Sequence, residues 1–345
     1  ACPGSGKTHT LISRYIYLIS QNKISNEETI LITFTKKSGM EMEERLSKLV
    51  PLSMPSYVGS LHGFCFRILQ KYNNINYTVL DEKDSRSLLR EILDNDNIIE
   101  DEIKAIIRSK IILIVEHAST NYPFSLKKSC DFFGMKQYSK AIIMYYKEYS
   151  RKKKQMKLLD FTDLMVLFCD FLKTKKAVDF LKEINYIFFD EYQDVNPIQN
   201  YILKQFKDAK TMVVGDDAQA IYKFRGSDVK YIWNFTEEFN QSEQFMLETN
   251  YRSTGEIINF CQAIISNNTK QFKKEVEPFT KDKGILPKVV AFPSDKDQYL
   301  WVVKDIKEKM SQGVKLKDIV ILSRKNHCLD RIELDLIGNN INVVK

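Results

Sequence analysis

The sequence predicts an α/β fold in which helices connect the strands of a parallel sheet. A glycine-rich turn at 4–6 runs directly into a segment, 11–19, with apolar residues at helical spacing. Short apolar runs typical of buried parallel strands occur at 30–34, 186–190 and 211–215. Segments with helical periodicity alternate with these runs, and this alternation is typical of a parallel sheet.

The first part of the sheet domain is expected over residues 1–72. After the first strand, an amphipathic helix is predicted over 36–49, because apolar side chains recur on one of its faces. Pro51 and Pro55 end this pattern. A further helix is expected over 61–72.

Residues 73–157 differ from the rest of the sequence. They contain little glycine, are rich in Lys, Asp, Glu, Ile and Leu, and show mostly helical periodicity. Connections inside a compact α/β domain usually have about two to six residues. We therefore predict an inserted helical subdomain, whose densest basic run, Arg151–Lys154, is interpreted as a solvated helix end.

The sheet domain is expected to resume over residues 158–254. A helix near 197–207 should connect the strands at 186–190 and 211–215. Phe245–Leu247 is predicted to be one more core strand.

A second α/β domain is expected over 255–345, where it would remain incomplete. Val289–Phe292 and Ile319–Leu322 are predicted strands. Between them, Ser294 can cap a helix that ends at Gly313.

The length and composition of the sequence limit the kinds of protein that it can encode. A length of 345 residues predicts two or three domains, because one core rarely serves more than about 250–300 residues. No apolar run of about 18 residues and no charged-then-apolar leader occurs, so we expect neither a membrane span nor secretion. The six scattered cysteines favour reduced thiols, and the net charge of +7 suits a polyanionic partner without proving one.

The segment Ala1–Thr8 has the pattern of a phosphate-binding loop. Its glycines allow backbone N–H groups to turn inward around phosphate oxygens. Lys7 can neutralise the β and γ phosphates, and the Thr8 hydroxyl can bind Mg²⁺. A strand should precede such a loop, so we expect the sequence to be a fragment that lacks its true N-terminus.

Two adjacent carboxylates end the strand at 186–190. Asp190 is expected to hold the metal ion, and Glu191 to orient and deprotonate the attacking water. Either signature alone could be structural, because a glycine run can be a plain turn and an Asp-Glu pair a solvated loop. Together they predict hydrolysis of a nucleoside triphosphate.

The residues after the strand at 211–215 carry polar and aromatic side chains. Gln219 can hydrogen-bond a γ-phosphate or the attacking water, which makes it a candidate sensor. Tyr222, Phe224 and Arg225 follow on a loop, and exposed rings beside cations suit single-stranded nucleic acid. The alternative is that Tyr222 and Phe224 are core residues.

The segment Leu247–Thr254 places Tyr251 and Arg252 near the expected domain boundary. Arg252 could reach a γ-phosphate as an arginine finger, and Tyr251 could stack on an adenine. A lone Asn-Tyr-Arg would more often be a structural turn, but its position after the other motifs adds weight to the functional interpretation.

The ordered motifs resemble those of UvrD/Rep/PcrA-like superfamily 1 DNA helicases over nearly the whole sequence. The matching segments are 1–8, 33–37, 59–64, 160–163, 190–194, 215–226 and 250–252. The resemblance implies a RecA-like parallel sheet, an inserted helical subdomain and the start of a second RecA-like domain. It also implies ATP and Mg²⁺ as ligands.

The resemblance assigns roles to matching positions only. ATP hydrolysis would use Lys7, Thr8, Asp190, Glu191, Gln219 and Arg252, with Thr8 and Asp190 on the metal. The nucleotide would contact Ala1, Cys2, Pro3, Gly4, Ser5, Gly6, Lys7, Thr8, Tyr251 and Arg252. Single-stranded DNA would contact Phe34, His62, Phe161, Tyr222, Phe224 and Arg225. Taken alone, His62, Phe34 and Phe161 would be interpreted as core residues.

Several departures from the family pattern are visible. Gly39 replaces a usual Ala and should weaken its helix by about 1 kcal/mol. The adenine-reading segment upstream of the loop, the two late motifs and a large insertion in the second domain are absent from this sequence.

The resemblance implies an ATP-driven 3′-to-5′ translocase acting on single-stranded DNA and on single-strand/duplex junctions, in repair, recombination or replication. It would work in the cytoplasm, nucleoid or nucleus, wherever the DNA is. Two alternatives stay open: a non-unwinding, DNA-binding ATPase module, and the motor subunit of a helicase–nuclease.

Overall fold

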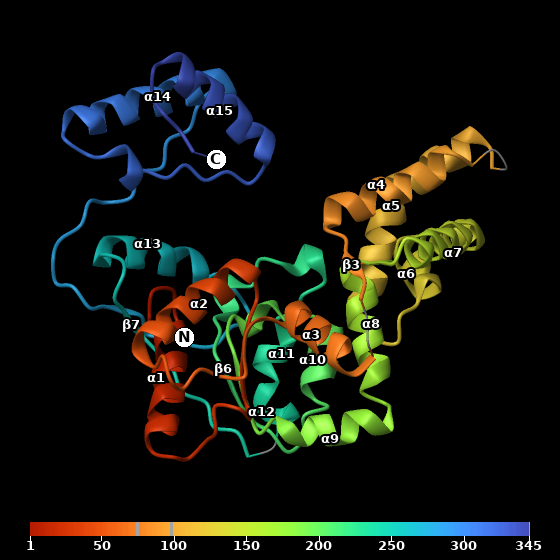
Figure 1. Cartoon of the computed structure of the whole chain (residues 1–345). Coiled ribbons are helices and arrows are strands. Elements are labelled where there is room, and N and C mark those ends of the chain that lie inside the picture. Colours follow the sequence, from red (N-terminus) through yellow and green to blue (C-terminus); the bar gives the residue numbers. More distant parts are fainter. Residues whose placement is uncertain (74–75, 97–98, 240, 345) are drawn as a thin grey trace. The chain divides into compact units, whose positions relative to one another are not determined.

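The predicted α/β class is confirmed. The computed structural model describes residues 1–73, 76–96, 99–239 and 241–344, in two compact units, Ala1–Gly284 and Ile285–Lys345 (Figure 1). The first unit contains a parallel sheet with the strand order β2-β1-β5-β6. These strands are β1 (Thr29–Thr33), β2 (Tyr57–Ser60), β5 (Tyr186–Phe189) and β6 (Lys210–Val213).

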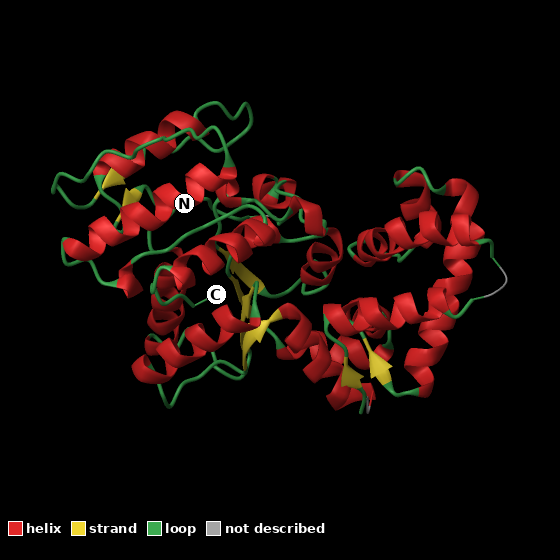
Figure 2. Cartoon of the chain, turned by 90° about the horizontal axis from the view of Figure 1, so that it is seen from above, coloured by secondary structure: helices red, strands yellow, loops and turns green. Residues whose placement is uncertain are grey.

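Helices cover both faces of this sheet (Figure 2). Successive residues of β1 point to opposite faces, as the twofold repeat of a strand requires. Leu31 packs with α1 and α2, while Ile30 and Ile32 pack with α3, α8 and α10. The bounds are α1 (Lys7–Ser20), α2 (Lys36–Leu49), α3 (Leu61–Asn73), α8 (Phe161–Phe171), α9 (Lys175–Glu183), α10 (Pro197–Leu203), α11 (Lys230–Trp233) and α12 (Phe235–Glu238).

Gly39 has a packing role that the sequence did not indicate. A Cβ atom at this position of α2 would lie 2.8 Å from the Cα of Gly59 in β2. Glycine therefore permits a close approach of helix and strand, which compensates for its low helix propensity.

The strands differ more from the sequence predictions than the helices do. The predicted strand at Phe245–Leu247 is wrong, because this segment has no strand ladder and its backbone accepts one hydrogen bond, from Cys2 N to Leu247 O at 3.0 Å. A two-residue strand instead lies just beyond it, where β7 (Thr249–Asn250) pairs with β8 (Glu277–Pro278). Strand β2 was missed, since only one of its four residues is buried and no apolar run marks it.

The helices between β3 (Thr78–Val79) and β4 (Leu158–Leu159) have a core of their own. The two strands pair in parallel, so the segment that leads into this region lies beside the segment that leads out of it. The helices are α4 (Glu82–Asp94), α5 (Asp101–Ser119), α6 (Leu126–Phe132) and α7 (Ser139–Gln155) (Figure 1, orange to yellow-green). Beyond α5, the backbone oxygen of Thr120 accepts a hydrogen bond from Ile198 N, which ties the helices to α10. The domain limits at 73 and 157 stay a prediction.

The remaining elements are helical. Helix α13 (Gly255–Ile265) precedes β8 in the first unit. In the second unit, α14 (Asp295–Ser311) begins after the Ser294 cap, as predicted, and packs on α15 (Asn326–Gly338) through Val303 and Leu336.

The two strands predicted in the second unit are wrong. The described residues at 289–292 and 319–322 have no strand partner. Val289 and Leu322 are largely exposed there, so apolar, β-branched composition alone did not produce a sheet.

The basic run Arg151–Lys154 is not simply a solvated helix end. Lys153 is 2% exposed, and its ammonium donates hydrogen bonds to Asp160 and Asp163 at 2.5 Å each. These two aspartates form the capping box at the start of α8, and Tyr149 also donates to Asp160. A buried cation therefore fixes the helix start that carries Phe161.

We predict that Lys153→Met destabilises the protein by about 3–5 kcal/mol, because two carboxylates would lose their buried counter-charge. Urea denaturation measures this change. The matched control is Lys154→Met, an exposed neighbour that should change stability by less than about 0.5 kcal/mol. Equal stabilities of the two variants would contradict the structural role of Lys153.

Candidate functional site

The glycine loop has the backbone geometry of an anion cradle. Gly4 and Gly6 have φ angles of 69° and 80°, in the left-handed region that favours glycine. Gly6 is the N-cap of α1, so the first free N–H groups of that helix lie beside the loop. Lys7, the first residue of α1, is buried. A phosphate chain would therefore meet backbone donors and one cation.

The loop and the acidic strand end meet directly. Thr8 Oγ1 donates a hydrogen bond to Asp190 Oδ2 at 2.7 Å. A hydroxyl oxygen and a carboxylate oxygen are both suitable ligands for Mg²⁺, and here the two lie next to each other at the carboxyl end of β5. Burial raises the pKa of the Asp190 carboxyl, and the charge of Glu191 adds to this, while the Thr8 hydrogen bond opposes it. A divalent cation at this point would fit the chemistry of both groups.

Glu191 follows in a strained backbone conformation. Its φ and ψ angles are 54° and 45°, which is uncommon for a residue with a Cβ atom. Such outliers persist where surrounding contacts fix them, and they concentrate at functional sites. The Glu191 side chain is held by a neighbour: its Oε2 accepts a hydrogen bond from Gln193 Nε2 at 2.9 Å.

Gln193 is a site residue that the sequence analysis missed. Its Oε1 accepts a hydrogen bond from Asp216 N at 3.0 Å, so one buried amide joins the residues that follow β5 to those that follow β6. A Cβ atom on Gly215 would lie 2.7 Å from the same oxygen. No local pattern marks this role, because the partner lies in a distant part of the sequence.

The Asn250–Arg252 turn is clamped onto the glycine loop. Asn250 Nδ2 donates to Pro3 O at 2.8 Å, and Tyr251 N donates to Gly4 O at 3.0 Å. Asn250 Oδ1 in turn accepts from Arg252 N at 2.8 Å. A Cβ atom on Gly4 would lie 2.8 Å from Arg252 Cβ. Arg252 thus lies against the loop, as an arginine that reaches a phosphate must.

Tyr251 lies on the same turn, and this residue is 62% exposed. Its ring packs against that of Phe279 in a tilted arrangement, with ring centroids 4.8 Å apart. The exposed ring has surface left for a base, and Phe279 is a second aromatic residue that the sequence analysis did not single out.

The predicted DNA-contacting residues fall into two groups. In the first, called the ring cluster, Phe34 and Tyr222 have centroids 5.0 Å apart, and Arg225 lies 5.9 Å from the rings of Tyr222 and Phe224. Phe224 is 78% exposed, so it is not the core residue that the alternative interpretation required. In the second group, His62 meets Phe161 at 5.3 Å. Burial lowers the pKa of His62 to about 4, so its ring is neutral at pH 7.

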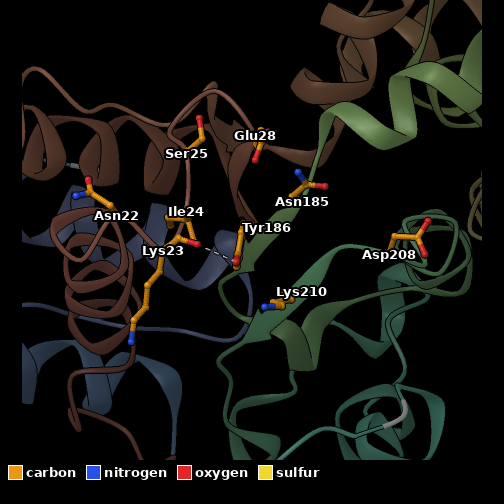
Figure 3. A pocket seen from close by; sticks show the side chains of 9 residues that line it. All are labelled: Asn22, Lys23, Ile24, Ser25, Glu28, Asn185, Tyr186, Asp208 and Lys210. Atoms are coloured by element: carbon orange, nitrogen blue, oxygen red, sulfur yellow. Dashed lines mark hydrogen bonds between the residues drawn. The ribbon is translucent and has the colours of Figure 1, made fainter.

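A separate hollow of about 470 Å³ lies at the opposite edge of the sheet, where the strands begin (Figure 3). Tyr186 lines it and donates a hydrogen bond from its hydroxyl to Lys23 O at 3.1 Å. None of the predicted site residues lines it. The lining residues are Asn22, Lys23, Ile24, Ser25, Glu28, Asn185, Tyr186, Asp208 and Lys210.

This arrangement is that of a P-loop nucleotide-binding domain with an aromatic surface beside the sheet. Residues 1–240 match the family described as UvrD/REP helicase N-terminal domain, and residues 245–345 match the UvrD-like helicase C-terminal domain. The chain belongs to the UvrD/REP helicase family.

Curated relatives agree with this assignment. The chain is 29% identical to the ATP-dependent DNA helicase PcrA of Staphylococcus aureus over 333 residues, which is 94% of this chain and 45% of the relative. It is also 29% identical to the ATP-dependent DNA helicase PcrA of Staphylococcus epidermidis over 350 residues, which is 98% of this chain and 47% of the relative. The chain thus spans about half the length of these relatives. Among its described residues, no helix has the length and apolarity to cross a membrane.

Proposed function

We propose that this chain carries the nucleotide-hydrolysing and strand-gripping parts of an ATP-dependent DNA helicase. The hydrogen bond between Thr8 and Asp190 is the observation that carries the proposal, because it joins the phosphate loop to the acidic strand end. The family membership and the name of the relatives support DNA as the track. The 3′-to-5′ direction and a role in repair, recombination or replication rest on the resemblance alone.

Each side chain has a distinct part in this proposal. The backbone of 1–8 and Lys7 would bind the phosphates, Arg252 would reach the γ-phosphate, and Tyr251 would stack on the adenine. Thr8 and Asp190 would hold Mg²⁺, which when bound neutralises negative charge on the phosphates. Glu191 would orient the attacking water and take up its proton.

The ring cluster would bind single-stranded DNA by stacking. Bases of any identity offer a face to an aromatic ring, so this surface would grip a strand without reading its sequence. Arg225 adds a cation for the phosphate backbone. His62 and Phe161 would extend the track.

Strand displacement tests the proposal as a whole. The full chain should hydrolyse ATP faster with single-stranded DNA and displace a duplex that carries a 3′ tail, but not one that carries a 5′ tail. DNA-stimulated hydrolysis without displacement would instead support a non-unwinding module. No hydrolysis at all would reject the motor interpretation.

We predict that Glu191→Gln lowers the turnover of ATP about 10²–10⁴-fold, because the amide cannot accept the proton of the attacking water. Binding of a fluorescent ATP analogue and of single-stranded DNA should be retained. Glu44→Gln, at an exposed position on α2, is the matched control and should leave turnover unchanged. Normal turnover by Glu191→Gln would remove this residue from its assigned role.

A second prediction concerns the ring cluster. Phe224→Ala should weaken binding of single-stranded DNA by about 1–3 kcal/mol, the contribution of one base–ring stack. Fluorescence anisotropy at fixed salt measures this loss. The control Phe132→Ala removes another exposed ring, on α6, and should leave DNA affinity unchanged. Equal affinities for both variants would exclude Phe224 from the track.

A further inference from the structure

Lys274 lies between α13 and β8, outside every motif identified from the sequence, yet its side chain is only 10% exposed. Its ammonium donates hydrogen bonds to the carboxylates of Asp216 and Asp217. The side chains of these aspartates are almost fully buried. Two adjacent carboxylates without solvent need a counter-charge, and Lys274 supplies it.

Asp216 connects this cation to the nucleotide site. One carboxylate oxygen accepts from Lys274, which leaves the other to accept from Gln219 Nε2 at 2.9 Å. The backbone N–H of Asp216 donates to Gln193, and Gln193 donates to Glu191. The candidate sensor and the candidate base therefore depend on the position of the same aspartate.

Asp217 connects Lys274 to two other parts of the chain, at Phe272 and at Trp233. Its second oxygen accepts hydrogen bonds from Phe272 N at 2.8 Å and from Trp233 Nε1 at 3.2 Å. Burial alone would raise the pKa of Asp217, but the hydrogen bonds from Lys274, Phe272 and Trp233 outweigh it and lower the pKa. Asp217 is also the first residue of the short helical turn Asp217–Gln219, which leads directly into the ring cluster.

We propose that Lys274 is a positioning residue that couples the ring cluster to ATP hydrolysis, by fixing Asp216 and Asp217 and through them Gln219 and Glu191. The proposal rests on the function proposed above. Without the ammonium, the two carboxylates repel each other, and the Gln219 amide loses its fixed acceptor. Lys274 belongs neither to the phosphate loop nor to the ring cluster, so it is part of neither binding surface. Its loss should therefore reduce turnover and its response to DNA, while leaving the binding of each ligand nearly intact.

The experiment compares Lys274→Met, Lys274→Arg and the matched control Lys273→Met in the full chain. Lys273 is the exposed neighbour of Lys274. The measurements are kcat and KM for ATP with and without single-stranded DNA, the affinities for a fluorescent ATP analogue and for DNA, and the melting temperature.

We expect Lys274→Met to lower the DNA-stimulated kcat about tenfold or more, because a buried acceptor loses its partner. Its KM and both affinities should stay within about twofold of the wild type, as for an interaction that acts on turnover rather than on binding. Lys274→Arg keeps the charge and should recover part of kcat. Lys273→Met should match the wild type.

A double-mutant cycle protects the test against misfolding of Lys274→Met. Asp217→Asn alone keeps Lys274, while Lys274→Met with Asp217→Asn removes one charge of each sign and restores the buried charge balance. The double variant should still have a lower DNA-stimulated kcat than Asp217→Asn. Equal values for these two variants, or a wild-type stimulation ratio in Lys274→Met, would overturn the proposal. Absence of DNA-stimulated hydrolysis in the wild type would instead reject the function on which it rests.

Discussion

The hydrogen bond between the Thr8 hydroxyl and the Asp190 carboxylate is the contact on which the candidate site depends. It joins the start of α1 to the end of β5, two points that are far apart in sequence. The Asn250 turn then fastens to the same loop through Pro3 and Gly4. The phosphate loop is therefore held by the sheet on one side and by the arginine-bearing turn on the other.

Elements that depend on interactions between neighbouring residues were easier to predict than elements that depend on distant partners. Helices such as α2, α3 and α14 were predicted closely, because their periodicity and caps lie within a few neighbouring residues. Strands depend on partners elsewhere in the chain. This explains why the apolar run at 319–322 forms no strand, while β2, with a single buried residue, pairs along the edge of the sheet.

The same distinction applies to the site. The glycine loop, the carboxylate pair and the aromatic loop could be identified from local spacing, and the structure joins the first two through the hydrogen bond from Thr8 to Asp190. Gln193 and Lys274 could not, because their roles consist of side-chain contacts with distant residues. A buried lysine has no signature of its own in sequence, as Lys153 also shows within a run of four basic residues.

The pairing of β3 with β4 has a consequence for how such chains can diversify. Since the inserted helices begin and end at neighbouring points, their loops and lengths can be altered, or the whole insertion grafted, without shifting the register of the main sheet. Contacts with the rest of the chain limit that freedom, among them the salt bridges of Lys153 at the cap of α8 and the backbone contact of Thr120 with α10. A replacement that kept these contacts could present a new surface beside an unchanged sheet domain.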